Sequence, residues 1–135
     1  MVDKIKQQLK EQLKTEDNIL KKEVINYILG YYDTDEDIKM FISDLLNHGC
    51  ISGMVNNLIY YKDTNNFFDV FEDEIEDLIT ENMDMLGVKT RPLFIESLNG
   101  SAENLEQEKN LLSWFAFEET ARNLNEELEI NKDFI

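Results

Sequence analysis

The scarcity of helix-breaking residues is the feature that most constrains this chain. Its 135 residues include a single proline, Pro92, and five glycines. Few stretches show the alternation of β-branched and polar residues that is typical of strands. Apolar residues instead recur at intervals of three and four through most of the sequence. This spacing predicts an all-α fold, a compact single-domain bundle of five to six helices around a buried C-terminal helix.

Two helices are predicted in the first thirty residues. The first lies within residues 1–16 and is peripheral, because Ile5, Leu9 and Leu13 form only a narrow apolar stripe. The second follows Asp17 or Asn18, either of which can cap its N-terminus. We expect this helix to end at Gly30, since glycine favours the left-handed conformation that terminates helices.

Two further helices are predicted before residue 62. Thr34 is placed to cap the first of them, with Asp37 three residues later in a weak form of the capping box. This helix is expected to stop at Asn47-His48-Gly49, and Ser52 is expected to cap the next one. The five apolar positions on the core face of the first are Ile38, Phe41, Ile42, Leu45 and Leu46.

The second half of the chain has a strong helix at each end and a weaker stretch between. Residues 65–86 form the clearest amphipathic pattern, and a final helix is expected over 103–128. The stretch Leu111–Phe117 is apolar nearly all round and should form the centre of the core. Residues 87–102 contain Pro92 and are expected to be an irregular connection, and 129–135 a frayed tail.

The negative charge is concentrated in one segment. The chain has a net charge of −16, and residues 61–86 hold one lysine against nine acidic residues, or half of that excess. At 100° per residue six of these acids lie opposite the apolar stripe: Asp69, Glu72, Asp73, Glu76, Asp77 and Asp84. We therefore expect this face to bind a partner. The predicted partner-binding residues are Asp69, Glu72, Asp73, Glu76 and Asp77.

This charge limits the partners that the chain can have. DNA, RNA and anionic membranes would be repelled, so none of them is expected to bind directly. A helix over 63–84 would carry a carboxylate about every 3.7 Å, close to the spacing of about 3.4 Å between phosphates on one DNA strand. An acidic face of this kind can imitate DNA toward a basic protein, although a solvated helix face has the same appearance.

The residues that usually carry catalysis or metal binding are few. His48 and Cys50 flank Gly49, but the residues of this break favour a helix terminator over a nucleophile and base. With one histidine and one cysteine there is no zinc ligand set and no intrachain disulfide. We expect no catalytic residues, no cofactor and no metal, and hence no enzyme.

One acidic residue is expected to have a structural role. Glu118 follows the apolar stretch and lies one helical turn before Arg122, in the favourable orientation for an ion pair. A partly buried carboxylate needs partners. The backbone amides at the break between Gly49 and Ser52 are suitable ones, so these four residues are predicted to form a polar tether.

Two segments resemble a known family. They are Leu46–Val55 with Leu58–Tyr61, and Trp114–Arg122. Across residues 38–124 the chain is similar to short, uncharacterised acidic proteins from phages and mobile elements of low-GC Gram-positive bacteria. The resemblance implies no known activity. It does favour counter-defence, in the manner of anti-restriction and anti-CRISPR proteins that mimic DNA.

Two functions remain open on this basis. The first is a non-enzymatic module that presents its acidic face to a nucleic-acid-binding host protein. The second is a helical interaction or homodimerisation module whose acidity serves only solubility. The second would depend on aromatic residues, which are enriched at interfaces: Tyr31, Tyr32, Tyr60, Tyr61, Phe67 and Phe134. Without a secretory signal or membrane span in the sequence, a cytoplasmic location is expected.

Overall fold

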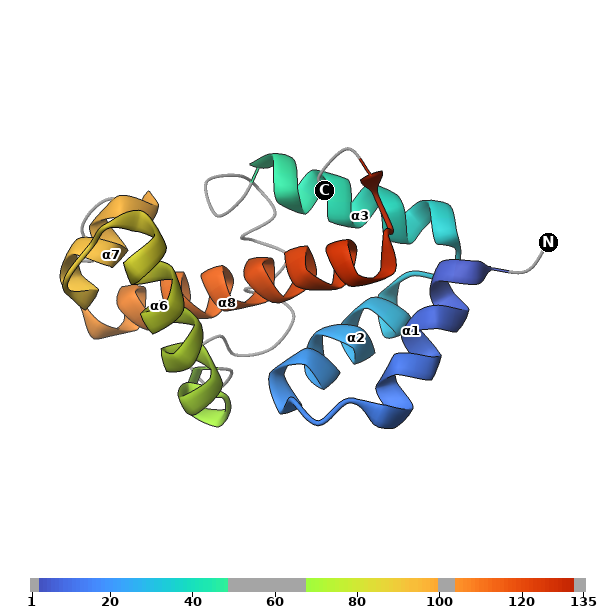
Figure 1. Cartoon of the computed structure of the whole chain (residues 1–135), viewed down its shortest axis with the longest axis horizontal. Coiled ribbons are helices and arrows are strands. Elements are labelled where there is room, and N and C mark those ends of the chain that lie inside the picture. Colours follow the sequence, from blue (N-terminus) through green and yellow to red (C-terminus); the bar gives the residue numbers. More distant parts are fainter. Residues whose placement is uncertain (1–2, 49–67, 100–103, 133–135) are drawn as a thin grey trace. The chain divides into compact units, whose positions relative to one another are not determined.

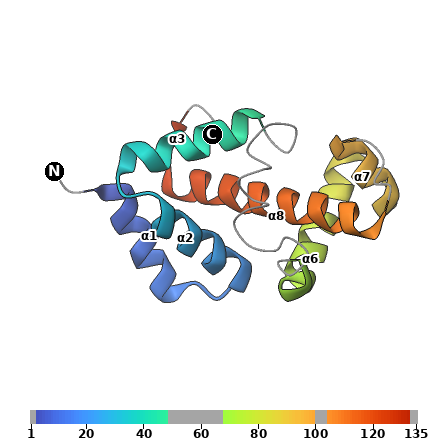
Figure 2. The same cartoon turned by 180° about the vertical axis from the view of Figure 1, so that it is seen from behind.

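The structure is a computed structural model that describes residues 3–48, 68–99 and 104–132. In those ranges every regular element is a helix, which confirms the all-α prediction. The helices are α1 (Lys4–Thr15), α2 (Ile19–Tyr31), α3 (Asp35–His48), α6 (Glu72–Leu86), α7 (Arg91–Asn99) and α8 (Leu105–Leu128) (Figure 1). The chain divides into a first unit, Met1–Asn47 with Thr120–Ile135, and a second unit, His48–Glu119. Helix α8 runs without interruption and belongs to both (Figure 2).

The first unit has the core that its helical periodicity predicts. Helix α3 buries all five of its expected apolar residues, and α2 buries a broad face that includes Leu20, Val24 and Ile28. The caps also follow the sequence. Asn18 Oδ1 accepts a hydrogen bond from the backbone N–H of Lys21 at 3.0 Å, and Thr34 Oγ1 accepts one from Asp37 at 3.1 Å. Each side chain binds one of the amides left without a partner at a helix start.

Gly30 does not end α2, contrary to the prediction. The helix continues to Tyr31, and the chain turns extended only at Tyr32. The Tyr31 ring lies against Tyr27 at a tilt of 32° with centroids 4.7 Å apart, while Tyr32 stacks on Phe41 of α3 at 4.6 Å. Burial raises the pKa of both the Tyr27 and the Tyr32 hydroxyl. This aromatic packing determines where the helix ends, and it overrides the local preference of glycine.

Helix α1 receives its N-terminal cap from a distant residue. The side chain of Asp3, the residue before α1, accepts no hydrogen bond from the described amides of this helix. The carboxylate of Asp35 in α3 instead accepts from the backbone N–H groups of Ile5 and Lys6, both at 3.1 Å. A negative charge at this end of a helix is favourable because the unpaired N–H groups carry partial positive charge. Asp35 thereby joins α3 to α1.

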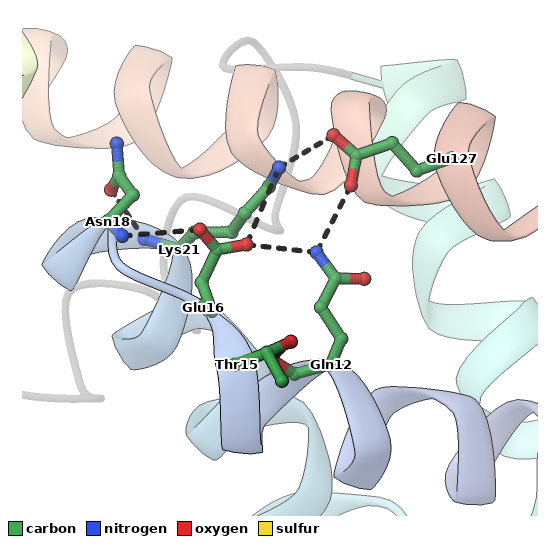
Figure 3. A network of polar contacts seen from close by, with 6 residues as sticks. All are labelled: Gln12, Thr15, Glu16, Asn18, Lys21 and Glu127. Carbon is green, nitrogen blue, oxygen red and sulfur yellow. Dashed lines mark hydrogen bonds and ion pairs between the residues drawn. The ribbon is translucent and has the colours of Figure 1, made fainter.

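A polar network joins α1 and α2 to the last turns of α8 (Figure 3). Glu127 accepts from Lys21 Nζ at 2.6 Å and from Gln12 Nε2 at 3.1 Å. The same Gln12 nitrogen donates to Glu16 at 3.0 Å. Burial raises the pKa of Glu16, but hydrogen bonds from Gln12 and from the backbone amide of Asn18, together with the charge of Lys21, outweigh this effect and hold it below its usual value.

The described part of the C-terminal tail is held in place, so the prediction that it frays is wrong for residues 129–132. Glu129 adopts a left-handed conformation with φ 51°, and the N–H of Ile130 donates to the carbonyl of Asn125 at 3.1 Å. The buried Asn125 side chain also binds both backbone groups of Asn131, at 2.7 and 3.1 Å. Ile130 is only 2% exposed and covers the end of the core.

In the second unit, the expected single helix over 65–86 is broken at Phe71. Residues 68–70 are helical, Phe71 is a turn residue, and α6 begins at Glu72. The buried side chains of Phe68 and Phe71, at 4% and 8% exposure, anchor this turn. Residues 65–67 lie outside the described ranges. Helix α6 ends at Gly87, whose φ of 72° allows the Val88 N–H to reach the Met83 carbonyl at 2.9 Å.

Residues 91–99 form helix α7, which corrects the prediction of an irregular connection over 87–102. Pro92 is the second residue of α7, where its missing N–H has no helical partner to lose. The helix buries Phe94 and Ile95 while Leu93 faces solvent. The run of three apolar residues is therefore neither a strand nor a loop.

The predicted centre of the core is confirmed in α8. From Leu112 to Phe117 every side chain is at most 6% exposed, including Ser113. The ring of Phe115 meets that of Phe94 edge to face, with centroids 5.0 Å apart. Helix α8 starts at the cap residue Asn104, whose Oδ1 accepts from the Gln107 N–H at 2.9 Å.

Candidate functional site

The outer face of α6 carries a row of carboxylates, which we call the α6 acidic stripe: Asp73, Asp77, Glu81 and Asp84. At 100° per residue these residues fall within about 80° of one another and lie opposite the buried Ile75 and Ile79. All four are exposed. Their side chains form no hydrogen bond or ion pair with any residue in the described ranges.

Only part of the predicted partner-binding set lies on this stripe. Asp73 and Asp77 belong to it, and Glu72 is exposed at the first position of α6. Asp69 precedes α6 and forms an ion pair with Lys109 Nζ at 2.9 Å. Glu76 is half-buried and pairs with Arg91 Nη1 at 2.8 Å. These two carboxylates stabilise the fold of the second unit.

Asp69 and Glu76 are parts of a cluster built around Phe68. Arg91 and Lys109 lie over the Phe68 ring, at 5.7 and 5.8 Å from its centroid. Arg91 Nε also lies 2.8 Å from Glu108 Oε1, close enough for an ion pair although the N–H is not directed at that oxygen. The cluster joins α6, α7 and the start of α8. It uses two of the four basic residues in the second unit.

The stripe is electrostatically unfavourable for the helix that carries it. The second unit has fifteen acidic residues against four basic ones, a net charge of −11, and α6 itself contains no basic residue. Asp73, Asp77 and Glu81 are spaced four apart, where like charges repel by about 0.2–0.5 kcal/mol per pair. Asp84 adds a negative charge at the helix end that disfavours it. Asp73 lies in the first turn of α6, where a negative charge is favourable, so it is the other three carboxylates for which the fold gives no reason.

Glu81 is the stripe residue that the sequence interpretation missed. It continues the four-residue spacing of Asp73 and Asp77, and this spacing is visible in the sequence. A single helix from residue 65 placed Asp69 and Glu76 on the same face, whereas the turn at Phe71 removes Asp69 from α6. Asp84 was on the expected acidic face but was not among the five selected residues.

The remaining predicted residues are only partly described. Glu118 and Arg122 of α8 are both half-buried, as expected for a structural role. Gly49 and Ser52 lie outside the described residues, and so does Cys50, so the polar tether stays a prediction. Within the described ranges no group of three or more His, Cys, Asp or Glu side chains is arranged to hold a metal ion.

We expect neutralisation of the stripe to stabilise the protein. Changing Asp77 and Asp84 to asparagine and Glu81 to glutamine, with Asp73 kept in the favourable first turn, should raise the free energy of unfolding at low salt by about 0.5–1.5 kcal/mol, because it removes like-charge repulsion. Urea unfolding measures the change, which should shrink at high salt. The matched control, Asp69→Asn with Glu76→Gln, should be destabilised instead, since it breaks two ion pairs. A less stable stripe variant would contradict this electrostatic account.

Fold and site together define a strongly acidic all-α protein with a row of carboxylates on α6 that have no partner in the described part of the chain. The chain belongs to the family described as "Domain of unknown function (DUF7222)", whose model matches residues 3–130. No curated protein and no solved structure matches it. None of the helices in the described ranges is long and apolar enough to cross a membrane.

Proposed function

We propose that this chain is a non-enzymatic, cytoplasmic protein-binding module of phage or mobile-element type. It presents the α6 acidic stripe to a basic groove of a nucleic-acid-binding host protein, as a counter-defence inhibitor would. The observation that carries the proposal is the stripe itself: four exposed carboxylates without partners in the described ranges, of which Asp77, Glu81 and Asp84 are unfavourable for the helix that carries them. Lysine and arginine side chains of a partner would relieve this repulsion on binding.

The row of charge supports a surface that basic groups can bind. The four stripe carboxylates lie between residues 73 and 84 of α6, which span about 16 Å along the helix axis. One carboxylate therefore follows about every 5.5 Å, against one phosphate about every 3.4 Å on a DNA strand. A groove that binds a phosphate backbone would find a sparser row of negative charges on α6. Such an interaction weakens steeply as salt rises.

The second candidate is a helical interaction or homodimerisation module. Tyr31 and Met40 of the first unit favour it, with exposures of 62% and 63%. Tyr32 supports it less, because its half-buried ring stacks on Phe41. Tyr60, Tyr61, Phe67 and Phe134 lie outside the described residues. Light scattering over a range of concentrations separates the two candidates, since only a dimerisation module gains mass at high concentration in high salt.

The proposed function predicts that reversing the stripe abolishes partner binding. A partner is first captured from bacterial lysate at low salt and identified, and its affinity for the purified protein is then measured. Changing Asp73, Asp77, Glu81 and Asp84 to lysine should weaken binding by about 100-fold or more, because several phosphate-like contacts become repulsive. DNA should compete with the wild-type protein for the partner.

A control with the same change of charge makes this test specific. Asp17, Glu36, Asp44 and Glu126 are exposed residues of the first unit with no ion pair to any other described residue. Changing these four to lysine should alter affinity by less than about tenfold, through long-range steering alone. If the stripe variant keeps full affinity, or if both variants lose it equally, the stripe is not the binding surface.

A further inference from the structure

A pocket of about 660 Å³ opens on the surface of the first unit. Three lysines from three parts of the chain line it: Lys4 in α1, Lys39 in α3 and Lys132 after α8. Their approach depends on two contacts already described, the binding of Asp35 to α1 and the Asn125 contacts that hold the chain after α8. We call this site the lysine pocket.

The three lysines are unpaired within the described ranges. The side chains of Lys4, Lys39 and Lys132 form no ion pair or hydrogen bond with any residue described there. Asp35 also lines the pocket, and both of its oxygens accept from the Ile5 and Lys6 amides. The lining therefore holds three cations against the two carboxylates of Asp35 and Glu129, which leaves an excess of positive charge.

The rest of the lining suits a small polar molecule. The volume falls within the range of about 300–1,000 Å³ that is typical of small-molecule sites. Gln8 and Glu129 add polar groups that can bind hydroxyls, and Leu128 and Ile130 add a limited apolar surface. A ligand that fits therefore carries a negatively charged group for the lysines and hydroxyl groups for Gln8 and Glu129.

We propose that the lysine pocket binds a small soluble phosphomonoester. Each lysine contributes a point charge with three rotatable donors, and a phosphate dianion can accept from all three. Gln8 and Glu129 would bind hydroxyl groups of the ligand body. The pocket residues belong to the first unit and the α6 acidic stripe to the second, so the two proposed sites share no residue.

The test is an NMR titration of the amide groups with glucose 6-phosphate at constant ionic strength. We expect saturable shifts confined to the pocket residues, such as Lys4, Gln8, Lys39 and Lys132. Inorganic phosphate should produce the same pattern more weakly, because it lacks the hydroxyl-bearing body. Glucose should produce no saturable shift, since it lacks the charge.

Two lysine variants complete the test. Changing Lys4, Lys39 and Lys132 to glutamine should raise the dissociation constant by about tenfold or more, the loss expected when charge-assisted hydrogen bonds are removed. The control makes the same change at Lys10, Lys14 and Lys22, which do not line the pocket. This variant should shift the dissociation constant by less than about threefold. The proposal is overturned by non-saturating shifts, by shifts away from the pocket, or by equal losses in the two variants. Thermal unfolding followed by circular dichroism verifies that both are folded.

Discussion

Replacing Phe94 with alanine is expected to lower the free energy of unfolding by about 3–5 kcal/mol. Phe94 is fully buried at 0% exposure, and its ring meets Phe115 of α8 edge to face at a centroid distance of 5.0 Å. Truncation removes that contact and leaves a cavity between α7 and α8. Since a domain of this size has a total stability of about 5–15 kcal/mol, the variant should be close to unfolding at ordinary temperature.

Chemical denaturation measures this loss, and the neighbouring residue provides the control. Leu93 is 49% exposed, so Leu93→Ala should cost less than about 1 kcal/mol. In a strand Ile95 would share the exposed face of Leu93, whereas in α7 it is 5% exposed, so a clear loss of stability for Ile95→Ala distinguishes the helix from a strand. If the Phe94 and Leu93 variants are equally stable, then α7 does not pack through Phe94 as described.

Replacing Asn125 with alanine is the second change with a large expected effect, a loss of about 2–3 kcal/mol. Asn125 is fully buried, and its side chain binds the N–H of Asn131 at 2.7 Å and its carbonyl at 3.1 Å. Without it, both backbone groups lose their partner, at a cost of about 1–3 kcal/mol for each group that stays buried. The segment that holds Ile130 over the core should then open.

Hydrogen exchange locates this effect within the chain. The amides of Ile130 and Asn131 should exchange much faster in Asn125→Ala, while amides in the middle of α3 lose only the protection expected from lower global stability. Asn123→Ala is the matched control, because Asn123 is exposed on the same helix and should change stability by about 0.5 kcal/mol or less. Unchanged exchange at Asn131 in the Asn125 variant would show that the tail is not held by this side chain.

The sequence by itself determined the helical class and the inner faces of the strongest helices. The apolar positions of α3 and the stretch Leu112–Phe117 of α8 are buried as their spacing predicts. Asn18 and Thr34 cap their helices through hydrogen bonds to amides three residues ahead. These features depend on neighbours within a few turns, and a helix brings such neighbours together in every fold.

The candidate site was determined only in part by the sequence. The concentration of charge in residues 61–86 and the outward direction of Asp73 and Asp77 follow from composition and periodicity. The pairing of Asp69 and Glu76 does not, because their partners Lys109 and Arg91 lie 40 and 15 residues further along the chain. Only the structure of the second unit shows that Asp69 and Glu76 form ion pairs while Asp73 and Asp77 stay exposed.

Tertiary contacts also acted at helix ends. Tyr32, which follows α2, stacks on Phe41 of α3, and Asp35 caps α1 from 30 residues away. Helix α7 forms in a segment of weak propensity because Phe94 packs against α8. The free energy of burying such side chains exceeds the differences of about 1 kcal/mol in local preference that a sequence reveals.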